Sequence, residues 1–246
     1  MRKLLPAFAR LFLLFASLLV FPATLLAQQT RECLVYDLSW TGIDVGRATQ
    51  EVSADGRTRR VVATFHSNAW LSLFLPVDDR IESSYDVVGA PFPGITRTYR
   101  MRLSEGRYQR DREIIFAPEK GRARYHDRLT GEVADVVIPP PTYDIYGSFY
   151  FVRHLPLEVG KSVFVNVLDG KEARRVEVQV LRREKLRTIF GRVETIVVRP
   201  LVAREGVFEV KKGVTIWLTN DSRRIPVRVE TKVTVGSVTA SLVEMR

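Results

Sequence analysis

Hydrophobic and polar residues alternate along most of the chain after residue 33. In 227–235 every odd position is apolar or Thr and every even position is polar, which is typical of a strand with one buried and one exposed face. The same alternation occurs at 95–103 and 175–180. Turn pairs such as Asp55-Gly56 separate these segments at spacings too short for crossover helices. We therefore predict a mainly β protein built from one curved antiparallel sheet, a half-barrel of about a dozen strands.

Further strands and the domain organisation follow from the same pattern. Weaker alternation predicts strands at 34–40, 43–52, 59–66, 77–86, 108–117, 122–127, 132–138, 162–168, 193–202, 213–219 and 237–244. The chain shows no repeat of fixed period and no charge-rich linker. We therefore expect 28–246 to form a single domain.

Two apolar segments break the two-residue period and predict short helices. The first, 68–75, begins at Asn68, a favourable capping residue, and is followed by Pro76. The second, 144–155, follows three prolines and ends before Pro156. It is aromatic on most sides, so we expect one or both helices to lie in the concave face of the sheet, with Phe149 largely buried.

The first 27 residues have the features of a secretory signal peptide. A basic start is followed by sixteen residues without charge, Leu11 to Leu26, and Ala27 suits cleavage before Gln28. The alternative is an uncleaved membrane anchor, which normally needs about 20 apolar residues. Cys33 has neither apolar nor small neighbours before it, which argues against a lipoprotein. We expect export across the inner membrane to the periplasm, with no transmembrane segment in the mature chain.

The formal charge of +10 raises the question of an anionic partner. Much of the excess lies in 97–128, and its centre is a candidate patch of four arginines, Arg100, Arg102, Arg107 and Arg110. Since an exported protein rarely meets nucleic acid, lipid head groups or a polyanionic glycan would be the partner. The alternative is a solvated face of the sheet.

Catalytic and metal-binding patterns are weak. The single Cys excludes an intramolecular disulfide, and His66, His126 and His154 lie on separate predicted elements without close His or Cys partners. No Gly-rich loop suggests a phosphate site. Asp79 would point away from its acidic neighbours on the strand, which predicts a buried carboxylate bonded to backbone or Arg. We predict no catalytic site, no metal and no cofactor.

The strongest candidate site is apolar. The first apolar segment supplies Trp70, Leu73 and Phe74, and the second supplies Tyr146, Phe149 and Tyr150. If the first segment is buried, it is core. If it is partly exposed, it marks the entrance to a site for a lipid or another apolar partner, and the aromatic residues of the second segment would line the same cavity.

Several stretches resemble an exported bacterial family known as domain of unknown function 3108. They are Cys33 to Trp40 leading into Ile43-Asp44-Val45-Gly46, then 77–83, 143–153 and, most specific, 216–228. The resemblance covers roughly 32–245. It implies a fold like that of periplasmic lipoprotein carriers, in which a curved antiparallel half-barrel holds helices against an apolar concavity. The family defines no activity or ligand residue.

Three functions remain open at this point. The leading one is a non-enzymatic envelope protein that binds an apolar or amphipathic molecule, such as a lipid or a lipidated partner, in a half-barrel cup. The second is an envelope scaffold that docks an anionic partner through its basic face. The third is an uncharacterised hydrolase. Peripheral contact with a membrane is compatible with the first two.

Overall fold

The computed structural model describes residues 30–87, 89–201, 213–233 and 235–246, so the predicted signal peptide at 1–27 lies outside the described residues. The first half contains β1 (Thr30–Trp40), β2 (Ile43–Ala54), β3 (Thr58–Ser67), α1 (Ala69–Ser72), β4 (Asp78–Asp86), β5 (Ile95–Glu105), β6 (Tyr108–Ala117), the 3-10 turn η2 (Pro118–Lys120), β7 (Arg122–Asp127) and β8 (Val133–Val137). The second half contains β9 (Thr142–Tyr143), α2 (Ile145–Arg153), β10 (Ser162–Leu168), β11 (Ala173–Thr188), β12 (Gly191–Leu201), β13 (Val214–Thr219), β14 (Pro226–Lys232) and β15 (Ser237–Met245). Neither α-helix in these ranges is long and apolar enough to cross a membrane.

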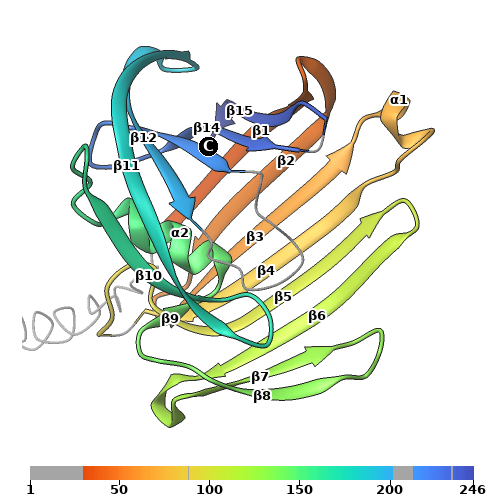
Figure 1. The fold of residues 1–246 in the computed structure, drawn as a ribbon, viewed down its shortest axis with the longest axis vertical. Helices are drawn as coiled ribbons and strands as arrows, with labels where there is room; N and C mark the ends of the chain where they lie inside the picture. The colour runs from red at the N-terminus through yellow and green to blue at the C-terminus, as the bar shows by residue number, and fades with distance from the viewer. Residues whose placement is uncertain (1–29, 88, 202–212, 234) are drawn as a thin grey trace, which may run out of the picture.

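The strands form one curved sheet that is open at its edges (Figure 1). Its order is β8-β7-β6-β5-β4-β3-β2-β1-β15-β14-β13-β12-β11-β10-β9, so the first and last strands pair in the middle. The pairs are antiparallel except β9–β10, where the two residues of β9 run parallel to β10. Bulges in β2, β5, β11, β14 and β15, each with one extra residue, let the sheet bend. The predicted mainly β fold with one curved, unclosed sheet is confirmed, with more strands than the expected dozen.

Side chains, rather than a hydrogen-bonded ladder, bring the two halves of the sheet together. Leu168 at the end of β10 is fully buried in a cluster that contains Tyr99 and Ile114 of β5 and β6. The next residue, Asp169, forms an ion pair with Arg112 of β6. The turn between β10 and β11 therefore packs across the inner face of β5 to β8, and the unclosed sheet takes a barrel-like shape.

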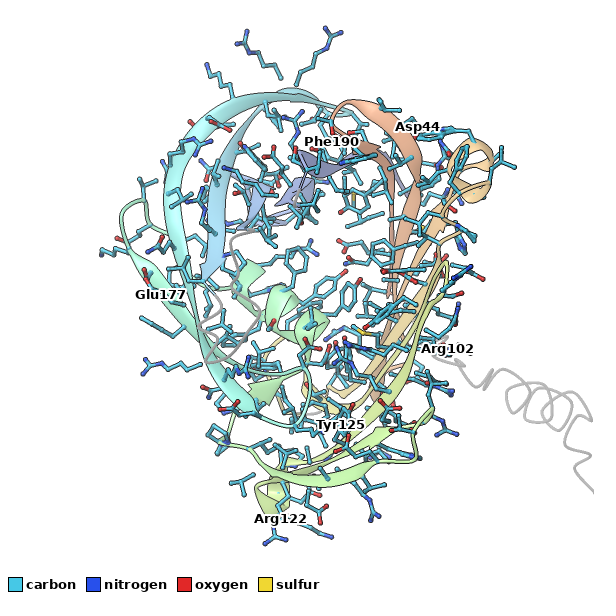
Figure 2. The ribbon with its side chains drawn as sticks, turned by 45° about the vertical axis from the view of Figure 1, so that its right-hand side comes forward. Asp44, Arg102, Arg122, Tyr125, Glu177 and Phe190 are labelled. Carbon is cyan, nitrogen blue, oxygen red and sulfur yellow. The ribbon has the colours of Figure 1, made fainter. Side chains whose placement is uncertain are left out.

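The helix α2 lies inside the curved sheet, as the sequence predicted (Figure 2). Asp144 caps its N-terminus, and its Oδ1 accepts hydrogen bonds from the backbone N–H groups of Tyr146 and Gly147 at 2.9 and 3.1 Å. One face of α2 packs against the wall, where the rings of Tyr143 and Phe151 stack with centroids 4.8 Å apart. The helix is therefore a fixed internal element.

The helix α1 is a single turn at the outer end of the sheet. Asn68 caps it as predicted, and its Oδ1 accepts the N–H of Leu71 at 3.1 Å. Leu73 and Phe74, immediately after the helix, are 80% and 81% exposed. The segment is therefore not core, and only α2 occupies the concave face.

Asp79 is a buried carboxylate, as its strand position predicted. It is 7% exposed, and its Oδ1 accepts the N–H of Ser104 at 2.9 Å. Burial raises the pKa of Asp79 to about 6 from 3.8, against the opposing effect of the Ser104 bond. The protonated form therefore contributes stability below about pH 4 that is lost as the pH rises to about 6.

We accordingly expect that the Asp79→Asn variant does not lose this stability as the pH rises. Asparagine keeps an acceptor for the Ser104 N–H and cannot ionise, so the melting temperature of the variant should rise relative to the native protein as the pH increases from about 4 to about 6. Thermal melts across that window provide the measurement, with Asp78→Asn at the exposed start of the same strand as the control. A constant difference between native and variant would show that Asp79 does not titrate there.

Candidate functional site

A cavity of about 790 Å³ lies inside the curved sheet, beside α2. Its walls come from β1 to β3, β6 and β10 to β15, and from the helix itself. The inward rows of β10 to β13 contribute the largest apolar part: Val165, Val167, Val176, Val178, Ile216 and Leu218. On β11, Val176 and Val178 alternate with polar Arg175, Glu177 and Gln179, so the period that predicted this strand also produces its part of the apolar wall.

The opposite wall is formed by small and aromatic residues. Ala48 of β2 and Phe65 of β3 are cross-strand partners, and both line the cavity. Ala240 of β15 is paired with Val229 of β14, and both line it as well. Small side chains at inward positions leave the space that larger ones would fill. The concave face is therefore hollow beside the helix rather than completely filled by it.

Of the three aromatic residues predicted on the second segment, the structure brings two to the cavity. Tyr146 and Phe149 of α2 line it, and both are half-buried because one side of each faces the cavity. Phe149 is thus less buried than expected. Tyr150 is 1% exposed behind this wall, where its hydroxyl donates to Glu32 Oε1 at 3.1 Å and accepts from Gln50. Its role in the structure is to hold the helix.

Charged groups gather at one end of the cavity. Lys171 and Glu172 lie in the turn between β10 and β11, are exposed and line the cavity, so the cavity reaches the surface there. Arg112 lines the same end at 8% exposure and pairs with Asp169. Each of these cations has a carboxylate partner, Lys171 pairing with Glu132 at 2.5 Å. The site is apolar along its length and charged at this entrance.

Sequence reasoning missed Arg112 as a site residue. The sequence pattern could have indicated it, because Arg112 shares the inward face of one strand with Ile114 and Phe116, and these two apolar residues are buried. An arginine in an inward apolar row must be paired or reach a polar opening. The partner, Asp169, is 57 residues away and could not be identified from local pattern.

The predicted residues of the first apolar segment lie elsewhere. Trp70, Leu73 and Phe74 surround α1 at the end of the sheet and are absent from the cavity wall. They are exposed, which favours an interaction surface over core, but one that is separate from the cavity.

The four arginines proposed as an anionic-partner patch fall into two groups. Arg100 donates to both oxygens of Asp111 at 3.2 and 2.9 Å, and Arg102 pairs with Glu82 at 3.3 Å. Both belong to ion pairs on the outer face, where Figure 2 labels Arg102. Arg107 and Arg110 are exposed and have no ion pair within the described ranges. The four are not one continuous set of unpaired cations.

The histidines show no arrangement typical of catalysis. His66 Nδ1 lies 3.1 Å from Asp78, with both side chains more than half exposed. His154 stacks on Phe92 with centroids 4.4 Å apart, and its Nδ1 lies 2.9 Å from the carbonyl of Tyr150. Among the residues that the structure places, no group of three or more His, Cys, Asp or Glu side chains is arranged to hold a metal ion.

The fold and the site define a β-barrel-like protein with an interior apolar cavity beside one enclosed helix. A family model described as "Protein of unknown function (DUF3108)" matches residues 35–243, and the chain belongs to that family. A solved structure with the same fold is a beta-barrel-like protein of domain of unknown function DUF1849 from Brucella abortus. It aligns with a TM-score of 0.58 and 11% identity, covering 88% of this chain and 97% of that one. No curated protein matches the sequence.

Proposed function

We propose that the protein binds an amphipathic molecule with one or more apolar chains, such as a lipid or the lipid portion of a partner, inside the curved sheet. The observation that carries this proposal is the cavity of about 790 Å³. Ligand sites are commonly concave and mostly apolar, with a few polar groups that orient the ligand. Its valine-rich walls suit hydrocarbon, and the charged entrance at Arg112 and Lys171 suits a polar head group.

We further propose that binding takes place in the cell envelope, without chemical conversion of the ligand. The basic and apolar leader at 1–27 supports export. The polar groups at the entrance form Arg–carboxylate and Lys–carboxylate pairs. Such pairs provide charges for recognition and no activated nucleophile.

Filling the cavity is expected to abolish binding without unfolding the protein. Ala240→Phe would place a ring among residues that line the cavity, so the affinity for the apolar fluorescent probe 1-N-phenylnaphthylamine should fall by about tenfold or more. Probe fluorescence during titration is the measurement.

The matched control is Val243→Phe on the same strand. Val243 does not line the cavity and is 39% exposed, so the added ring should leave probe binding unchanged. Circular dichroism melts verify that both variants fold. Equal probe affinity for Ala240→Phe and the native protein would contradict binding in this cavity.

A further inference from the structure

One end of the sheet carries a group of exposed large apolar side chains that do not line the cavity. We call it the apolar rim and define it as Trp40, Ile43, Trp70, Leu73, Phe74 and Leu75. Their exposed fractions run from 39% for Trp40 to 81% for Phe74. Monomeric soluble proteins rarely expose such a contiguous group unless it serves an interaction.

Hydrogen bonds connect the segments that carry the rim. The indole of Trp70 donates to the carbonyl of Asp44, which ties α1 to the turn between β1 and β2 next to Ile43. Gly106, in the turn between β5 and β6, donates its N–H to the carbonyl of Pro76 at 2.8 Å, beside Leu75. In Figure 1 α1 projects at this end, and Figure 2 labels Asp44 near it.

We propose that the apolar rim inserts into the interfacial region of a lipid bilayer. The rim is made of turns and one helical turn that protrude, which suits insertion among acyl chains. Tryptophan is typical of the membrane–water interface, where its ring is buried and its N–H still needs a partner. Leu73 and Phe74, as the most exposed members, would lie deepest.

Four N–H groups of the rim already have partners within the protein, which lowers the cost of insertion. The indole N–H of Trp40 donates to the carbonyl of Val235, and that of Trp70 to the carbonyl of Asp44, each at 2.8 Å. The backbone N–H groups of Phe74 and Leu75 donate to the carbonyl of Leu71 at 2.9 and 2.7 Å. Groups with internal partners lose little when water is removed.

The charges beside the rim favour an anionic bilayer. Arg107 follows Gly106, and Arg110 lies three residues further, with its guanidinium 5.4 Å from the centre of the exposed Tyr108 ring. Both arginines are exposed and have no ion pair within 4.0 Å in the part of the chain that the structure covers, and Arg110 is near enough to Asp127 to help lower the pKa of that carboxyl. The nearby carboxylate of Asp44 instead accepts a hydrogen bond from Asn68. Exposed arginines at the edge of an apolar surface attract anionic head groups.

The test is co-flotation of the purified protein with vesicles of phosphatidylethanolamine and phosphatidylglycerol. The native protein should float with the vesicles and show a blue shift of tryptophan fluorescence. Leu73→Ser combined with Phe74→Ser should weaken binding about tenfold or more, because two exposed apolar side chains no longer enter the bilayer. Arg107→Glu combined with Arg110→Glu should weaken binding to these vesicles and leave the weaker binding to phosphatidylcholine vesicles unchanged.

The matched control is Ile115→Ser combined with Val137→Ser, two exposed apolar residues on β6 and β8 away from the rim. This variant should bind vesicles like the native protein. Retained flotation of the Leu73 and Phe74 variant would overturn the proposal, as would a native protein that does not bind vesicles. The proposal would also be overturned if the native protein is a dimer and the Leu73→Ser, Phe74→Ser variant is a monomer, because the rim would then be the contact between two copies. We expect the rim variants to bind the naphthylamine probe like the native protein. The flotation test therefore tests the rim separately from the cavity.

Discussion

Arg153→Met is expected to lower the free energy of unfolding by about 3–5 kcal/mol, because it leaves a carboxylate without its cation inside the protein. The Arg153 side chain is 4% exposed at the end of α2. Its two terminal nitrogens donate to the two oxygens of Glu32 at 3.0 and 3.1 Å, and one also donates to the carbonyl of Arg223 at 2.9 Å. In the variant, Glu32 would keep only the hydroxyl of Tyr150 as a donor among these contacts.

The matched control is Arg47→Met, which breaks an Arg–carboxylate pair of similar length with Asp37. That pair is 3.1 Å long, and its side chains are 63% and 49% exposed. Exposed pairs contribute about 0–1 kcal/mol, so the control should unfold close to the native protein. Urea denaturation followed by circular dichroism measures both. Equal losses in the two variants would show that the Arg153 contacts do not hold α2 to β1 and to the turn that contains Arg223.

The alternation of residues was sufficient to predict the class of fold. Strands with one wet and one dry face were visible locally, as in β4 and the first half of β11. The two residues of β9 were missed because they are too few to show a period. The enclosed helix was predicted because its proline boundaries are local signals as well.

The shape of the site depends on contacts that local pattern does not contain. Arg153 and Glu32 are 121 residues apart, and Arg112 and Asp169 are 57 apart. The first pair fixes the position of α2 and the second fixes the turn after β10. Together these positions determine how much of the concave face stays hollow. Sequence reasoning found the aromatic residues of the helix and could not distinguish a filled cup from a cavity beside it.

The apolar segment around α1 shows a second limit of prediction from the local sequence. Large apolar residues beside a capped turn have the same local pattern whether they enter a core or an exposed rim. What places them outside is the pairing of their neighbours, since β3 and β4 on either side are adjacent in the sheet and α1 only spans their ends. The two interpretations were therefore separable only once strand order was known.

Asp144→Ala is expected to cost about 3 kcal/mol or more, since it removes both a helix cap and a buried acceptor. Asp144 is fully buried, and its Oδ1 accepts from the hydroxyls of Ser83 and Tyr85 at 2.8 and 3.1 Å as well as from the N–H groups of Tyr146 and Gly147. Ser83 and Tyr85 are themselves buried on β4. Alanine leaves all four donors without this acceptor, and unpaired buried donors are costly.

The companion variant Asp144→Asn distinguishes the acceptor from the charge. Burial raises the pKa of Asp144, so the neutral form is favoured relative to an exposed aspartate, and asparagine keeps one carbonyl oxygen for the four donors. Its free energy of unfolding in urea should therefore stay within about 1 kcal/mol of the native value.

The control is Asn68→Ala, which removes the cap of the single-turn helix α1 and should cost about 1 kcal/mol. If Asp144→Asn is as unstable as Asp144→Ala, the charge rather than the shared acceptor holds α2. If both asparagine and alanine behave like Asn68→Ala, the contacts to β4 contribute nothing, and α2 is held by the Arg153 and Tyr150 contacts and by its apolar packing.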